Sequence, residues 1–435
     1  SRIYAFRLWY TVGKRPTRRP SSWSGRAGRM VARLSISLAL LFLSADLPAE
    51  ESVSPLPENV SLLETDPEGI GQSQVPQRPS NFDSIRNGER GISIAPVYYG
   101  EVFTNARGGL STNNATRYLG LLDIPITLDF QKIGWRAPGR FFLLGQHTHG
   151  EGLTENFVGD SLFISNIDSF VNITRIGEYG WEADIIEDKV TVRLGKQDVN
   201  TEFLRIDTAS DFIQSTFGLS PSTAFPTYPN QSMAAVLLVK PNDSWRVGFG
   251  IWDAFYAGGN SGISGNGSIF VVGEIEYSYS LANGTFPGKL ALAATYESAG
   301  ELAGEPASPV HEYSFQIEQF LFREEDAIDA DLQGLAMFAG YYPRFPGDLV
   351  PDKSIGDSLI AGFVYTGLIP RRDRDVAGAG VAWVELFKGG TGQETVIEWF
   401  DKANINSHLS IQPDMQYVIS PSGIYPDALV TGLRF

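Results

Sequence analysis

The chain has no cysteine and only four histidines among its 435 residues. Disulfide bonds, thiolate metal sites and a cysteine nucleophile are therefore excluded. Basic residues are scarce outside the N-terminal segment: residues 1–49 hold nine Lys or Arg and one acidic residue, which leaves 25 basic and 49 acidic residues for the rest. A net charge of about −24 in that part argues against nucleic acid as a partner, because nucleic-acid binding needs a basic surface.

Long apolar runs are also missing. The run at 34–43 has ten residues, whereas a membrane-spanning helix needs about 20. It follows the basic start Met30 to Arg33 and precedes small residues that end at Ala49. This order predicts a secretory signal peptide, cleaved after Ala45 or Ala49.

Four segments are therefore expected. Residues 1–29 precede the start-like methionine and are interpreted as translated upstream sequence or a misplaced start, with a long basic region of the signal as the alternative. Residues 30–49 form the signal peptide. Residues 50–90 are rich in Pro, Ser, Gln and acidic residues and predict a flexible leader. Residues 91–435 form the folded body.

The body shows a period of two in hydrophobicity. Apolar residues alternate with polar ones most clearly at 275–280, 311–318 and 407–419. Strands of this kind have one apolar face and one polar face, which fits a barrel with lipid outside and a wet lumen inside. A soluble β-sandwich alternates in the same way, so this pattern alone leaves both folds open.

Connection lengths favour the barrel. Sixteen candidate strands begin near residues 93, 117, 139, 169, 189, 232, 244, 269, 288, 311, 332, 357, 376, 393, 406 and 425. Short turns at 187–188, 241–243, 282–284 and 403–405 tend to alternate with long connections at 150–168, 198–231, 255–268, 298–310 and 343–356, although 322–331 and 367–375 are long for turns and 388–392 is short for a loop. We therefore predict an all-β fold, a transmembrane antiparallel β-barrel of 16 strands with short periplasmic turns and long external loops.

The aromatic residues fit this prediction. The chain ends on Phe435, after an alternating strand. A terminal aromatic residue resembles the signal that the barrel-assembly machinery reads, so that machinery is an expected partner. Other aromatic residues near predicted strand ends fit interfacial girdles or ordinary strand preference: Tyr98, Tyr99, Trp135, Trp245, Tyr341, Tyr342, Trp383 and Trp399.

Five stretches resemble the carbohydrate-selective porin family of the OprB type, in the family's order. They are Gly152–Asp160 with Ser165–Ile167, Arg193–Asp198 with Asn200–Phe203, Ser215–Gly218 with Pro226–Pro229, Tyr365–Pro370 with Arg374 and Asp375, and Glu394–Glu398 with Leu409–Tyr417 and Asp427–Leu433. The resemblance covers about 90–435. It implies a 16-stranded outer-membrane channel, functional as a monomer, in which an inward loop narrows a pore lined by Arg and Glu and through which sugars diffuse.

Two features depart from the family pattern: the last strand ends soon after Leu433, and the body is more acidic than is typical. The acidity puts the charge preference of the channel in doubt. The segments 150–168 and 198–231 would contribute to the constriction.

Candidate lumen residues follow from the alternation and the motifs. Sugar hydroxyls both donate and accept hydrogen bonds, so carboxylates and the fixed fork of arginine suit them. Arg193 lies between Val192 and Leu194 and is expected to point inward. The full candidate set is Arg175, Glu178, Arg193, Lys196, Asp198, Glu202 and Arg205.

Structural roles remain open for several of them. Asp198 and Glu202 suit loop capping equally well, and Arg193 suits a lumen salt bridge. Glu274 and Glu276 are interpreted as solvated lumen residues.

Small sugars as solutes and outer-membrane lipid are therefore the expected partners, without a cofactor or metal. The alternatives are a general or cation-preferring porin, an outer-membrane barrel enzyme, and a plugged adhesion barrel. His147 and His149 share one strand face, but no matching ligand cluster lies nearby in the sequence, and no Gly-x-Ser-x-Gly motif occurs.

Overall fold

The computed structural model describes residues 91–221, 226–254, 261–264, 267–282, 284–298, 301–302, 305–306, 309–324, 333–346, 354–387 and 392–435. The predicted upstream, signal and leader segments lie outside these residues. Four short helices occur in the described part: η3 (Thr154–Val158), η4 (Val199–Thr201), η5 (Asp207–Ala209) and η6 (Pro421–Gly423). No helix among the described residues has the length and apolar character needed to cross a membrane.

Strands make up most of the described chain. They are β1 (Ile92–Ile94), β2 (Val97–Arg107), β3 (Thr116–Asp129), β4 (Arg140–Gly150), β5 (Thr174–Ile186), β6 (Val190–Gln197), β7 (Ser232–Asn242), β8 (Trp245–Asp253), β9 (Ile269–Leu281), β10 (Phe286–Glu297), β11 (Glu301–Leu302), β12 (Glu305–Pro306), β13 (Val310–Arg323), β14 (Gly334–Tyr342), β15 (Arg344–Pro346), β16 (Ser354–Thr366), β17 (Val376–Phe387), β18 (Gly392–Asn406), β19 (Leu409–Ile419) and β20 (Ala428–Arg434).

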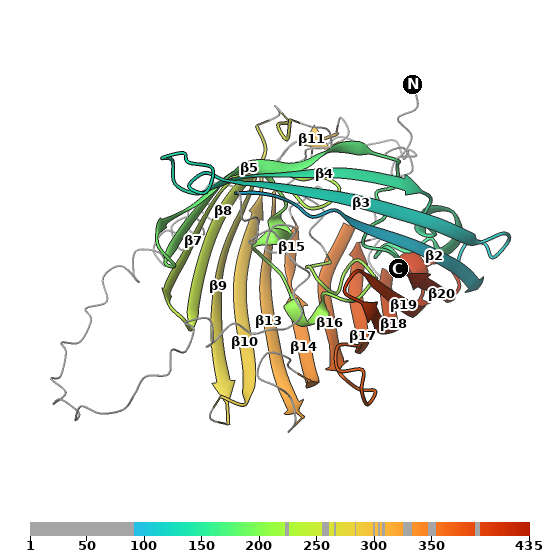
Figure 1. Cartoon of the computed structure of the whole chain (residues 1–435). Coiled ribbons are helices and arrows are strands. Elements are labelled where there is room, and N and C mark those ends of the chain that lie inside the picture. Colours follow the sequence, from blue (N-terminus) through green and yellow to red (C-terminus); the bar gives the residue numbers. More distant parts are fainter. Residues whose placement is uncertain are drawn as a thin grey trace. The chain divides into compact units, whose positions relative to one another are not determined.

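The sheet closes on itself. Its 18 strands pair antiparallel with their neighbours, and the last strand, β20, pairs with β2 (Figure 1). Two of the 18 are three-residue pieces: β1 continues β2 across Pro96, and β15 continues β14 across Pro343. Proline has no N–H to donate to a ladder, so each strand breaks there. The remaining sixteen strands form the barrel, which confirms the predicted fold and strand number.

The barrel carries short turns at one end and long connections at the other. Asp243–Ser244 and Ser407–His408 join their strands directly, whereas 151–173 and 198–231 separate theirs. The predicted turn at 403–405 is wrong: these residues belong to β18, and the chain turns at Ser407–His408. An irregularity between Asn404 and Asn406 shifts the register there, so the strand runs further than its alternation indicates.

Apolar side chains face outward on many strands, the reverse of a water-soluble protein. On β13, Tyr313 and Phe315 are 38% and 48% exposed, whereas Glu312 and Gln316 are each 4% exposed. The predicted faces of 275–280, 311–318 and 407–419 agree with this pattern.

The inner face is polar over only part of the barrel. On β14 to β20 many inward side chains are apolar and fully buried, among them Phe338, Ile360, Val384 and Phe400. The expectation of a polar lumen face is therefore wrong for this sector, where segments of chain cover the wall. Tyr342, for which the sequence left an interfacial girdle or ordinary strand preference open, is also buried inside this apolar cluster, so it is not part of a girdle.

Candidate functional site

Two long connections fold into the barrel and pack on its apolar sector. The connections 151–173 and 198–231 carry η3, η4 and η5, and their segments appear in green inside the barrel in Figure 1. Their buried apolar side chains join one core with the inner wall: Leu153, Phe157, Val158, Leu162, Ile164, Ile206, Ala209, Phe212, Ile213 and Phe217. Hydrophobic burial therefore holds both connections against β14 to β20.

Charged side chains gather on the other sector. On neighbouring strands, Arg140 contacts Glu182 at 2.6 Å, and Glu182 contacts Arg193 at 3.2 Å. Arg193 also pairs with Glu202, which comes from the connection 198–231. The carboxylate of Glu202 lies 2.8 Å from Arg246 on β8. An alternating chain of charges therefore links the wall to the infolded connection.

This chain of ion pairs continues from β8 to β9. Arg246 lies 3.4 Å from Glu274 and 3.2 Å from Glu276, both on β9.

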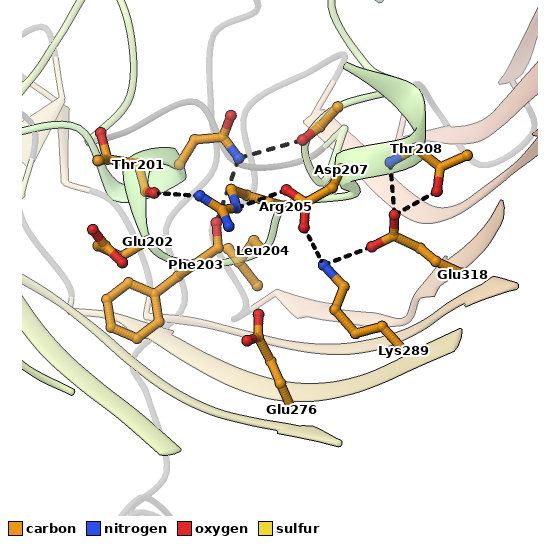
Figure 2. Close-up of polar contacts among 12 residues, drawn as sticks. Thr201, Glu202, Phe203, Leu204, Arg205, Asp207, Thr208, Glu276, Lys289 and Glu318 are labelled. Carbon is orange, nitrogen blue, oxygen red and sulfur yellow. Dashed lines mark hydrogen bonds and ion pairs between the residues drawn. The ribbon is translucent and has the colours of Figure 1, made fainter. Parts of the chain in front are cut away.

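Figure 2 shows a second group of ion pairs, between the connection 198–231 and the strands β10 and β13. Arg205 lies 3.0 Å from Asp207, and Lys289 lies 2.7 Å from Asp207 and 2.6 Å from Glu318. We call the following set the charged network: Arg140, Glu182, Arg193, Glu202, Arg205, Asp207, Arg246, Glu274, Glu276, Lys289 and Glu318.

The network keeps its loop carboxylates ionised. Burial alone would raise the pKa of Glu202, but Arg193 and Arg246 hold it below its usual range. Burial likewise opposes ionisation of Asp207, yet Lys289 and Arg205 lower its pKa to about 2. The network therefore keeps both loop carboxylates charged at neutral pH.

Side-chain exposure varies within the charged network. Arg193, Lys289 and Glu318 are 4%, 7% and 4% exposed. Arg205 and Glu202, both from the connection 198–231, are 27% and 20% exposed. A guanidinium and a carboxylate on the infolded connection thus offer a donor and an acceptor to the lumen.

A family model decides what this barrel is. Residues 113–435 match the model described as "Carbohydrate-selective porin, OprB family". The chain belongs to this family. It is therefore an outer-membrane β-barrel porin, and the family is one of porins rather than enzymes, as predicted.

Solved porin structures share the fold. The high-pH structure of Pseudomonas putida OprB superposes with a TM-score of 0.68 at 21% identity, over 79% of this chain and 93% of that chain. The low-pH structure of the same protein gives a TM-score of 0.54 at 17% identity, over 80% and 96% of the two chains. No curated protein sequence matches this chain.

The porin barrel divides the predicted site residues into two groups. Arg193, Glu202 and Arg205 belong to the charged network. The other four lie against the wall beside the connection 198–231 and are buried: Arg175, Glu178, Lys196 and Asp198.

Three residues of the second group have structural partners. Arg175 donates to Gln231 at 2.8 Å, and Lys196 donates to the carbonyl of Ile176 at 2.7 Å. Asp198 accepts hydrogen bonds from the backbone N–H groups of Asn200 and Tyr228, at 2.8 and 2.7 Å. The capping alternative considered for Asp198 therefore describes its geometry.

A bulge at Gly177 explains why Arg175 and Glu178 both point inward. Leu144 pairs with Glu178, but the next residue, Gly145, pairs with Ile176, so Gly177 is an extra residue in β5. One extra residue reverses the alternation beyond it.

Sequence reasoning missed several members of the network. Arg140, Glu182, Arg246, Lys289 and Glu318 were not singled out, although each is a charged residue in an alternating segment. Glu274 was interpreted as merely solvated, which is wrong: it is 3% exposed and accepts a hydrogen bond from the N–H of Leu204 at 2.7 Å. Their positions on the inward face of alternating segments were the signal that could have identified these residues.

The histidine pair belongs to the outer surface. His147 and His149 alternate on β4 with the buried inward residues Gln146 and Thr148. His149 stacks on Tyr98, whose side chain is 42% exposed. These imidazoles therefore do not line the lumen.

A buried acid in the first infolded connection makes stability depend on pH. Asp160 is 5% exposed, and burial raises its pKa from 3.8 to about 7. The folded state therefore binds an extra proton between about pH 4 and pH 7, and stability falls as pH rises through that range. Replacing Asp160→Asn is expected to raise the thermal unfolding midpoint by about 1–3 °C at pH 8 and to leave it unchanged at pH 4.

The control for this variant is Glu151→Gln, because Glu151 lies in the same connection with a side chain 51% exposed. Glu151→Gln also replaces an acidic side chain by its amide, but at an exposed position. An equal rise at both pH values for Asp160→Asn would contradict the assignment.

Proposed function

We propose that this porin is a passive channel through which neutral sugars of monosaccharide size diffuse across the outer membrane into the periplasm. The observation that carries the proposal is the partly exposed pair Arg205 and Glu202 on the infolded connection, both of which belong to the charged network. A hydroxyl group can accept a hydrogen bond from the guanidinium and donate one to the carboxylate. Few such contacts are needed, since a solute must also leave.

Charge balance favours neutral solutes over cations. Residues 50–435 carry a net charge of about −24. The network, however, contains five basic and six acidic side chains, paired with one another. A nearly neutral, ion-paired lining exerts little long-range attraction on either sign of ion. The excess of acidic residues therefore does not imply a cation-preferring pore.

The C-terminal residue supports assembly through the barrel machinery. The Phe435 ring packs on Gly100, where a Cβ atom would lie 2.6 Å from it. Phe435 and Gly100 also exchange two backbone hydrogen bonds, of 2.8 and 2.9 Å, across the closing seam. We include that machinery and outer-membrane lipid among the proposed partners.

Single-channel conductance of the refolded chain in planar bilayers tests the proposed function. We expect open channels whose current falls saturably when glucose is added. Channels that ignore glucose but separate cations from anions would replace the proposal with a general porin. A folded barrel without conductance would favour a plugged adhesion barrel.

A further inference from the structure

Two sequence motifs lie away from the charged network. Glu394–Glu398 and the segment Gln412–Gln416 lie on β18 and β19, in the sector that the infolded connections cover. The first and last residues of each motif are four positions apart, and residues with this spacing lie on the same face of a strand. In both motifs this is the inward face. Glu394, Glu398 and Gln416 are 0% exposed, and Gln412 is 3% exposed.

The two glutamates accept hydrogen bonds from backbone N–H groups of the connections. Glu398 accepts from Ile213 at 2.7 Å and from Gln214 at 3.1 Å, one bond to each carboxylate oxygen. Glu394 accepts from Ser161 at 2.8 Å and from Leu162 at 3.0 Å, again one to each oxygen. Each carboxyl group thus binds two consecutive peptide N–H groups. Glu394 binds the connection 151–173, and Glu398 binds the connection 198–231.

The two glutamines do the reverse. Their side-chain amides donate to backbone carbonyls, from Gln412 to Asp211 at 2.7 Å and from Gln416 to Ile164 at 2.9 Å. Residue type therefore matches the partner: the carboxyl oxygens accept from N–H groups, and the side-chain amides donate to C=O groups.

These contacts provide hydrogen-bond partners for buried peptide groups of the two connections. The connections are largely irregular in structure, so their peptide groups lack regular partners, and they lie in an apolar core with Phe212 and Ile213. Unpaired peptide groups in such surroundings are costly. Apolar packing can hold a segment against a wall, but only directional bonds fix its depth along the barrel axis.

We propose that Glu394, Glu398, Gln412 and Gln416 are positioning residues that set how deep the two connections lie in the lumen. We call these four residues the peptide clasp. By fixing Asp211 to Gln214, the clasp holds one flank of the segment that presents Glu202 and Arg205. The network holds the same flank closer to Arg205, where Glu318 accepts from the N–H and the hydroxyl of Thr208, each at 2.6 Å (Figure 2). The clasp thus sets the constriction without contacting solute.

Glu398→Gln tests this role directly. The amide nitrogen of glutamine would face a backbone N–H, so one bond is lost and a donor opposes a donor. The hydrogen-exchange rate of the amides at Ile213 and Gln214 is expected to rise by about tenfold to a hundredfold. Open-channel current noise should rise with it, while the barrel keeps its heat-modifiable mobility on gels.

The matched control is Glu385→Gln, since Glu385 is an exposed residue on β17. It removes the same charge and should change neither readout. Exchange rates that stay at the wild-type level in Glu398→Gln, in a folded barrel, would overturn the proposal.

A second variant covers the case in which Glu398→Gln fails to fold. Gln412→Leu keeps side-chain size and charge but removes the donor to Asp211, and it should raise exchange around 211–214 and current noise. Unchanged exchange and noise in this variant would likewise overturn the proposal. Hydrogen exchange needs no solute, so its outcome does not depend on whether the channel passes sugars.

Discussion

Replacing Arg205 by Ala (Arg205→Ala) is expected to weaken the proposed saturable block of the channel by glucose about tenfold to a hundredfold. This is the expected loss for removing a charged hydrogen-bond donor, since such bonds contribute about 1.5–3 kcal/mol. Arg205 is the network guanidinium on the infolded connection, and its side chain is 27% exposed. The measurement is the glucose concentration that halves the blockable current in planar bilayers.

The conservative variant Arg205→Lys separates charge from geometry. Lysine keeps the positive charge near Asp207 but lacks the planar fork. Block should therefore remain weakened while ion selectivity stays at the wild-type value. If glucose blocks Arg205→Ala as strongly as the wild type, Arg205 does not bind the solute, and Glu202 becomes the next residue to replace.

Replacing Arg193 by Met (Arg193→Met) is expected to destabilise the barrel by about 1.5–3 kcal/mol, the contribution of hydrogen bonds to charged groups. Glu182 and Glu202 each lose one of two cationic partners and keep only Arg140 and Arg246, respectively. Arg193 is 4% exposed, pairs with Glu182 and Glu202, and lies with its guanidinium 5.1 Å from the centre of the Phe142 ring. The lost positive charge should also move the reversal potential in a salt gradient toward cation preference. Urea unfolding in detergent and bilayer reversal potentials measure the two effects.

Arg140→Met is the control for Arg193→Met. It loses contact with the same carboxylate, Glu182, but its side chain is 24% exposed. A partly exposed pair contributes only about 0–1 kcal/mol.

The double variant Arg193→Met/Glu202→Gln should recover part of the stability and the ion selectivity, because it removes one of the two carboxylates that lose a cationic partner in Arg193→Met. The mutant cycle then gives the coupling between these two residues. Additive effects of the two substitutions would show that they do not act as a pair.

The strands were largely predictable from sequence because alternation has a period of exactly two, and a slip of one residue would turn apolar side chains into the lumen. Each of the sixteen predicted strand starts lies within about five residues of an observed strand. The exception at 403–405 shows the limit, since an irregularity lets a strand continue through turn-like residues.

The candidate site was predictable only in part. Arg193 was found because its neighbours Val192 and Leu194 indicate its face. Its partner Glu182 was missed, because the pairing depends on the register between β5 and β6. Local sequence does not set that register; the turn and the packing of the whole barrel do.

What the sequence by itself determined was therefore the closed barrel, its two ends and the residue types available to its faces. Only the tertiary structure decided which inward residues contact solute, which bind peptide groups and which lie under apolar cover. Glu398 and Ile213, 185 residues apart, meet because a long connection folds into the lumen. The path of such a connection is set by contacts with many strands at once, so no local pattern in either segment encodes it.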